Sequence, residues 1–175
     1  MMIPDFDTLV AQAADLLAGC RANRLTLATA ESCTGGLIAA ILTEVPGSSD
    51  VFERGFVTYS NAAKTEQIGV PAALIEEHGA VSEAVARAMA AGALRHSRAD
   101  LAGAVTGVAG PGGGTAAKPV GLIHLAAARR GGPLLHREIR TGDIGRRAIR
   151  LASVAEALAL LRAIMGQPAG AAALP

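Results

Sequence analysis

Short β-prone runs alternate with helix-like segments along this chain, and their order constrains the fold more than any other sequence feature. The first three runs are each followed by a helix or a glycine-rich loop, and the final two runs of the chain are separated only by a short turn. Strands separated by helices, followed by consecutive strands, indicate one mixed sheet with helices on both faces. The expected fold class is therefore α/β, a single three-layer α/β/α sandwich with a mixed central sheet.

Hydrophobic periodicity sets the approximate bounds of these elements. Apolar residues spaced by three and four predict a first helix over 6–22. The remaining helices are expected at 37–45, 61–68, 71–79, 83–96 and 146–164, and the strands at 25–30, 52–60, 101–106, 119–128 and 134–141. Residues 1–165 are expected to form one domain and 166–175 a frayed tail, because 175 residues leave little chain for a second core.

Composition excludes several classes of protein. The net charge of +1 creates no overall field for nucleic acid or an anionic membrane, and no apolar run approaches the roughly 20 residues of a membrane span. The first ten residues carry acids where a signal peptide needs bases. The two cysteines, Cys20 and Cys33, form neither a disulfide framework nor a CxxC metal site, which indicates a reduced, cytoplasmic protein. We therefore expect no membrane partner and no nucleic-acid partner.

Three polar or glycine-rich segments follow predicted strands, namely 31–36, 59–64 and 106–118. In an open α/β sheet, ligands bind at the carboxyl ends of the strands. We therefore expect these three segments to meet at one crevice.

The segment Glu31-Ser32-Cys33-Thr34-Gly35-Gly36 joins a predicted strand directly to a predicted helix. Such a turn places backbone N–H groups beside the Ser32 hydroxyl, where they could bind an anion or an oxyanion. The alternative is that Ser32 or Thr34 only caps the helix while the glycines allow close packing. Cys33 is the competing nucleophile, although a cysteine just inside a helix is more often a packing residue.

Lysine is rare in this chain, since Lys64 and Lys118 are the only two among 16 basic residues. A partly buried Lys64 with a lowered pKa could accept a proton from serine, which arginine cannot do. The alternative is an ordinary solvated side chain on the first turn of a short helix. The sequence alone does not establish that Ser32 and Lys64 meet.

Two further features are compatible with phosphate binding. The loop over 107–115 is rich in glycine but does not match the Walker A pattern, and it could equally be a surface turn. Arg146, Arg147 and Arg150 open the last helix, where cations oppose the helix dipole unless an anion is bound. A solvated basic face is the alternative for these arginines. The sequence contains neither a His-x-His nor an HExxH pattern, so no metal site is expected.

Several long motifs occur in order along almost the whole chain, from about residue 6 to 165. They are TAESCTGGLIAA, PGSSDVFERGFVTYSNAAK, GAVSEAVARAMAAGA, AVTGVAGPGGGTAAKPVG and the arginine-rich final helix. Together they resemble the CinA C-terminal-domain family, the nicotinamide-nucleotide amidohydrolases or NMN deamidases (PncC-like).

This resemblance implies hydrolysis of the carboxamide of nicotinamide mononucleotide (NMN) to nicotinate mononucleotide and ammonia, in pyridine-nucleotide salvage. It implies an α/β sandwich, usually dimeric, that needs no metal or other cofactor. The family's nucleophilic serine corresponds to Ser32, its lysine to Lys64, its tyrosine to Tyr59 and the threonine of its TGxAGP loop to Thr106. The residues expected to bind substrate are Thr34, Gly35, Gly36, Ser48, Thr106, Gly107 and Arg146.

The chain departs from the family pattern in one place, and two other functions stay open. The family commonly has Gly-Asp-Arg before the last helix, whereas Gly142-Asp143 is followed here by Ile144-Gly145-Arg146. We expect Arg146 to take the place of that arginine. The chief alternative function is a non-catalytic nucleotide-binding module of the competence/damage-inducible family. An interaction subunit for DNA uptake or repair rests only on the family's name.

Overall fold

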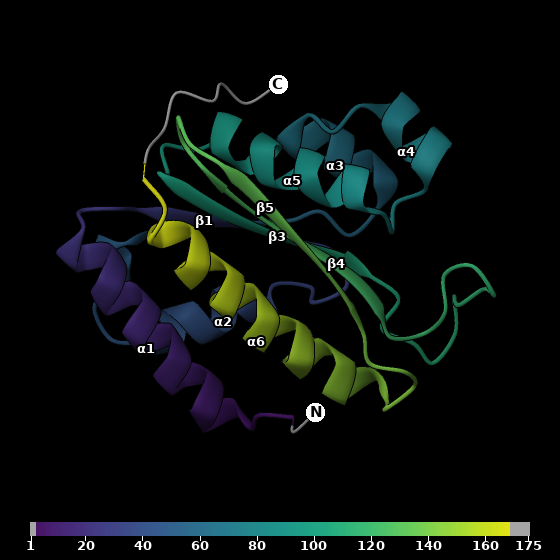
Figure 1. Cartoon of the computed structure of the whole chain (residues 1–175), viewed down its shortest axis with the longest axis horizontal. Coiled ribbons are helices and arrows are strands. Elements are labelled where there is room, and N and C mark those ends of the chain that lie inside the picture. Colours follow the sequence, from purple (N-terminus) through teal and green to yellow (C-terminus); the bar gives the residue numbers. More distant parts are fainter. Residues whose placement is uncertain (1–2, 169–175) are drawn as a thin grey trace.

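The structure is a computed structural model that describes residues 3–168. A five-stranded sheet lies between two layers of helices (Figure 1). This confirms the expected three-layer sandwich with a mixed sheet. Residues 169–175, most of the expected tail, lie outside the described residues.

The sheet has the strand order β2-β1-β3-β4-β5. Its strands are β1 (Leu27–Glu31), β2 (Phe52–Val57), β3 (Leu101–Gly107), β4 (Leu122–Arg129) and β5 (Leu134–Arg140). β1 pairs in parallel with β2 and β3, whereas β3–β4 and β4–β5 are antiparallel. The two antiparallel pairs agree with the consecutive strands expected in the second half of the chain.

Helices cover both faces of the sheet (Figure 1). One layer contains α1 (Phe6–Ala22), α2 (Leu37–Glu44) and α6 (Arg146–Met165), and the other contains α3 (Asn61–Ile68), α4 (Ala72–His78) and α5 (Glu83–Arg95). Each layer buries its own apolar cluster against the sheet, which is why the central strands are buried on both faces.

The expected bounds need small corrections. β1 extends to Glu31, which was expected in the turn, and β2 ends at Val57 rather than Ser60. Ser60, not Asn61, caps α3, because its hydroxyl accepts the N–H of Ala63 at 3.0 Å. Gly107 is the last residue of β3 rather than a loop residue.

The chain order places a crossover point at β1. From β1 the chain crosses through α2 to β2 on one side, and then through α3–α5 to β3 on the other side. The carboxyl ends of these three parallel strands therefore meet around the residue that follows β1, which is Ser32. Among residues 3–168, no helix combines the length and apolar character that crossing a membrane requires.

Candidate active site

The turn after β1 is shaped by two glycines with positive φ. Gly35 has φ +59° and Gly36 has φ +92°, a backbone conformation that residues with a Cβ rarely adopt. This turn brings the chain from β1 into α2 within five residues, 32–36. Ser32 is held at the sheet because its N–H donates to the carbonyl of Val105 on β3 at 3.0 Å.

Glu31, at the end of β1, supports this turn from inside the protein. Its carboxylate is 1% exposed and accepts the N–H groups of Ile38 at 3.0 Å and Ala39 at 2.8 Å, in the first turn of α2. The hydroxyl of Thr34 also donates to it, at 2.7 Å. A carboxylate at a helix N-terminus stabilises both the helix and its own charge. The helix is thus capped by Glu31, and the idea that Ser32 or Thr34 caps it is wrong.

Backbone N–H groups remain available around Ser32. Gly35 N–H donates to the Ser32 carbonyl, Leu37 N–H donates to the Thr34 carbonyl, and the next two amides of α2 donate to Glu31. Among the described residues, the N–H groups of Cys33, Thr34 and Gly36 donate to no acceptor. Cys33 and Thr34 are buried, whereas Gly36 is partly exposed, so the Gly36 N–H is the candidate for binding an oxyanion.

Ser32 and Lys64 are in contact. Lys64 Nζ donates to Ser32 Oγ at 3.1 Å and to the carbonyl of Thr58 at 2.9 Å. Lys64 extends from the first turn of α3 and is 1% exposed, so the interpretation of a solvated side chain is wrong.

Burial shifts the pKa values of Lys64 and Cys33 in opposite directions. Burial lowers the pKa of the Lys64 amine, with a smaller opposing effect from Cys33, and so favours the neutral amine that a general base requires. Burial raises the pKa of the Cys33 thiol to about 12, and the side chain is only 6% exposed. A buried thiol with this pKa is an inert packing residue, which leaves Ser32 as the nucleophile candidate.

Arg146 connects the other two segments at this end of the sheet. Its Nη1 donates to the carbonyl of Gly110 in the glycine-rich loop at 2.9 Å, and its Nη2 donates to Tyr59 Oη at 3.0 Å. Tyr59 is 57% exposed, and its hydroxyl hydrogen stays free for another acceptor. The three segments that follow β1, β2 and β3 thus meet at one edge of the sheet, as predicted.

Arg150 lies one turn further along α6 and reaches the Ser32 turn itself. Its Nη2 donates to the carbonyl of Thr34 at 2.6 Å. A shallow groove of about 450 Å³ runs beside it, lined by Phe6, Leu37, Arg146, Arg147, Arg150 and Leu151. Arg146 and Arg150 therefore both contact backbone carbonyls around the site and also border an open groove that could admit an anionic group.

The remaining predicted site residues have distinct positions. Thr106 is 1% exposed, and its hydroxyl donates to the carbonyl of Ala80 at 2.8 Å, so its side chain holds the loop before α5. At Gly107, a Cβ would come within 2.3 Å of Ile123 Cδ1, so close packing of β3 on β4 requires glycine there.

Ser48 is not part of this site within one copy of the chain. It precedes β2, and β2 runs beside β1 from the Leu27–Phe52 pair to the Glu31–Val57 pair. Ser48 therefore lies at the amino end of the strands, roughly 17 Å from the end where Ser32 lies. The expectation that it binds substrate beside Ser32 is corrected by this topology.

Sequence reasoning missed two residues that contact the site, namely Glu31 and Thr58, and it singled out Arg150 only as a possible phosphate ligand. The position of Glu31, directly before the serine turn, was a usable signal, because carboxylates are favoured at helix N-termini. No local signal marked Thr58, which contributes a backbone carbonyl. Among residues 3–168, no three His, Cys, Asp or Glu side chains are grouped so that they could hold a metal ion.

Comparisons with known proteins identify the relatives of this chain. The sequence model of the CinA C-terminal domain matches residues 9–165. A CinA-like protein of Mycolicibacterium vanbaalenii is 55% identical over 151 residues, which are 86% of this chain and 34% of the relative. A CinA-like protein of Synechococcus sp. (strain CC9902) is 52% identical over 158 residues, 90% of this chain and 37% of the relative. The chain thus spans about a third of the length of these curated relatives.

Solved structures match over nearly their whole length. The competence/damage inducible protein CihA from Agrobacterium tumefaciens is 51% identical with a TM-score of 0.89, and the match covers 95% of this chain and 99% of that one. A CinA superfamily protein from Escherichia coli is 32% identical with a TM-score of 0.85, and the match covers 94% of each chain. The chain belongs to the CinA C-terminal domain family.

Proposed function

We propose that this protein hydrolyses the carboxamide of NMN to nicotinate mononucleotide and ammonia, with Ser32 as nucleophile and Lys64 as general base. The observation that carries this proposal is the 3.1 Å contact between Ser32 Oγ and the buried Nζ of Lys64. A neutral amine within hydrogen-bond distance of a partly exposed serine is the arrangement that serine–lysine acyl transfer requires. The family to which the chain belongs supports the choice of substrate.

The first half of the reaction forms an acyl-enzyme. Lys64 Nζ takes the proton of Ser32, and Oγ forms a bond to the carboxamide carbon. The N–H group of Gly36 would stabilise the negative oxygen of the tetrahedral intermediate. When the C–N bond breaks, protonated Lys64 returns its proton to the leaving nitrogen, which departs as ammonia.

The second half releases the product. Lys64 Nζ, again neutral, takes a proton from water, whose oxygen attacks the acyl carbon. The ester bond to Ser32 breaks, and Oγ recovers its proton from Lys64. Nicotinate mononucleotide leaves and the dyad is restored.

Tyr59 and Arg146 are the candidates for holding the nucleotide. Because the tyrosine oxygen accepts from Arg146, its own hydrogen can donate to a substrate oxygen. The guanidinium of Arg146, at the edge of the groove, would attract the 5′-phosphate.

The proposal is tested by measuring ammonia release from NMN by the purified protein, with free nicotinamide as a second substrate. Turnover of NMN far above that of nicotinamide is expected, because the phosphate supplies binding energy that the free base lacks. Tight binding of NMN without ammonia release would instead support a non-catalytic nucleotide-binding module.

Activity is expected to survive removal of divalent metals. The proposed mechanism uses an amine and a hydroxyl, and residues 3–168 contain no cluster of metal-ligating side chains. Ammonia release should be equal before and after treatment with EDTA. Loss of activity that is restored by Zn²⁺ or Mg²⁺ would contradict the serine–lysine mechanism.

Arg146→Ala is expected to raise the KM for NMN about tenfold while changing kcat less, because it removes a charged hydrogen-bond donor from the phosphate. The matched control is Arg147→Ala, the neighbouring exposed arginine that also borders the groove. Steady-state kinetics on both variants separate the two parameters. A normal KM with a reduced kcat in Arg146→Ala would show that this residue does not bind the phosphate.

A further inference from the structure

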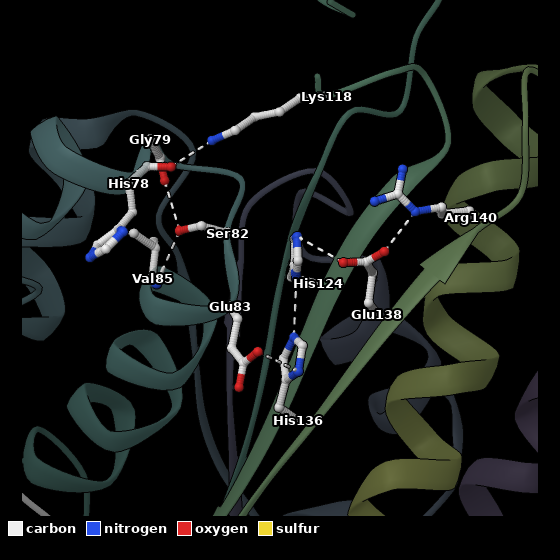
Figure 2. Close-up of polar contacts among 10 residues, drawn as sticks. All are labelled: His78, Gly79, Ser82, Glu83, Val85, Lys118, His124, His136, Glu138 and Arg140. Carbon is white, nitrogen blue, oxygen red and sulfur yellow. Dashed lines mark hydrogen bonds and ion pairs between the residues drawn. The ribbon is translucent and has the colours of Figure 1, made fainter. Parts of the chain in front are cut away.

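A second group of titratable side chains lies on β4, β5 and α5. β4 is two strands away from β1, the strand that precedes Ser32. We call Glu83, His124, His136 and Glu138 the histidine cluster (Figure 2). Both rings are largely buried, with side chains 9% and 12% exposed for His124 and His136. The proposed mechanism uses none of these residues.

The cluster is a continuous chain of contacts. Nδ1 of His124 lies 3.1 Å from Nε2 of His136, with the rings stacked. At one end, His136 Nδ1 lies 3.4 Å from Glu83 Oε2, and at the other, His124 Nε2 lies 3.8 Å from Glu138 Oε2. Figure 2 shows these contacts running from α5 across to β5.

The charges around the two rings balance when both rings are neutral. Each carboxylate uses its other oxygen to accept from an arginine, Glu83 from Arg87 at 2.7 Å and Glu138 from Arg140 at 2.6 Å. Burial lowers the pKa of both imidazoles, although the two carboxylates oppose this effect. Burial thus favours the uncharged form of both rings, and the 3.1 Å contact between them needs a lone pair on one of the two facing nitrogens. The charged groups facing them are Glu83 and Arg87 from α5, Glu138 and Arg140 from β5, and Lys118 from the glycine-rich loop.

Two neutral rings supply only two N–H groups for three contacts, so one contact must lack a hydrogen. The contact without a hydrogen is the longest one, at 3.8 Å between His124 Nε2 and Glu138. The hydrogen on His136 Nδ1 then faces Glu83 Oε2 at 3.4 Å, a charge–dipole contact rather than a hydrogen bond, and His124 donates from Nδ1 to His136 Nε2. The distances thus assign the Nδ1–H tautomer to both histidines.

The Glu83 end of this chain lies next to the candidate active site. Thr106, whose hydroxyl donates to the Ala80 carbonyl, pairs across the sheet with His124 and lies on the strand next to Ser32. Lys118 Nζ donates to the carbonyl of His78 at 2.6 Å, at the other end of the same segment (Figure 2). The segment 78–83 is thus fixed at three points, and the histidine cluster provides one of them.

We propose that His136 is a positioning residue, held in its Nδ1–H tautomer by His124, that fixes the first turn of α5 and with it the Ala80–Thr106 contact beside Ser32. α5 also supports the helix that carries Lys64, because a Cβ at Gly92 would lie only 2.1 Å from the carbonyl oxygen of Ile68. A loosened α5 would therefore disturb both the Thr106 side and the Lys64 side of the site.

The first test is the tautomer state, which does not depend on any activity. Ring ¹⁵N signals of uniformly labelled protein at neutral pH should show Nδ1–H for His124 and His136. The exposed His78 is the internal control and should show the Nε2–H form that free imidazole side chains prefer. An Nε2–H tautomer at His136 would overturn the proposal, because Glu83 would then face a lone pair.

The second test uses two matched variants of His136. Asparagine places an N–H donor where Nδ1 lies and keeps the contact with Glu83, whereas glutamine places its amide where Nε2 lies and loses that contact. In His136→Gln, amide hydrogen exchange at Val85 and Ala86 should accelerate roughly fivefold, the effect of one lost polar contact, while His136→Asn should stay near wild type. Equal exchange in the two variants would contradict the proposal.

Catalysis supplies a third measurement that rests on the proposed function. The kcat/KM for NMN should fall roughly fivefold in His136→Gln and recover in His136→Asn, in step with exchange. If wild-type protein releases no ammonia, the proposed reaction is wrong, while the tautomers and exchange rates still decide the role of His136. If activity is unaffected while exchange accelerates in His136→Gln, then α5 does not position the site.

Discussion

Replacing Ser32 with alanine is expected to lower ammonia release from NMN at least about 10³-fold, because no acyl-enzyme can form without the hydroxyl. Folding should be retained, since Ser32 is anchored through its backbone N–H to Val105, and Lys64 is the only hydrogen-bond partner of its side chain among residues 3–168. Binding of NMN should change little. Single-turnover and steady-state kinetics measure the loss of catalysis, and calorimetric titration with NMN measures binding separately.

Cys33→Ala is the matched control for this substitution. Its thiol is buried and its pKa is raised to about 12, so its removal should affect stability more than chemistry. The opposite result, an active Ser32→Ala protein and an inactive Cys33→Ala protein, would assign the nucleophile to the cysteine. It would also require the turn to open and expose that thiol.

The architecture was predictable because most of its determinants are local. Apolar spacing and turn residues marked all six α-helices of the described residues, and the order of strands and helices implied the mixed sheet. The bounds were wrong where a polar residue continued a strand. Glu31 belongs to β1 because its carboxylate is compensated by the N-terminus of α2, a tertiary contact that no local pattern reveals.

The site was predictable in its residue types but not in all its positions. Ser32, Lys64, Tyr59 and Arg146 lie at one edge of the sheet because the carboxyl ends of parallel strands meet there. Ser48 was misplaced because its polar turn comes before a strand rather than after one.

Arg146 and Arg150 show a second limit of the sequence. The sequence left a bound anion and a solvated basic face as alternatives for them, but the structure gives them backbone carbonyls around the site as partners. Carbonyl oxygens carry partial negative charge, so they reduce the unfavourable interaction of these cations with the helix dipole. An anion is therefore not required to explain their position, and kinetic measurement on Arg146→Ala is needed to assign one.

Lys64→Arg is expected to be nearly as damaging as Lys64→Ala, each lowering kcat/KM on the order of 10²–10⁴-fold, the usual contribution of a general base. Guanidinium keeps the positive charge but cannot accept the proton of Ser32. It is also larger than an ammonium group, and the position is 1% exposed. Because misfolding of the arginine variant would give the same loss, circular dichroism and thermal unfolding must first show that both variants are folded.

The pH dependence of the wild-type enzyme tests the same role without a substitution. Burial lowers the pKa of Lys64, so the neutral base becomes available below the ordinary value of about 10.4. The kcat/KM should therefore rise with pH, through a limb that reports this amine in the free enzyme, and level off once the amine is neutral.

The stability of the protein should depend on the same amine, because the unfolded chain binds a proton that the native amine has lost. The free energy of unfolding should thus increase with pH between the native and the unfolded pKa of Lys64. Selective ¹⁵N labelling of lysine distinguishes Lys64 from the half-buried Lys118, whose amine donates to the His78 carbonyl. If the amine of Lys64 titrates near 10.4 and the activity limb lies far below it, another group deprotonates Ser32.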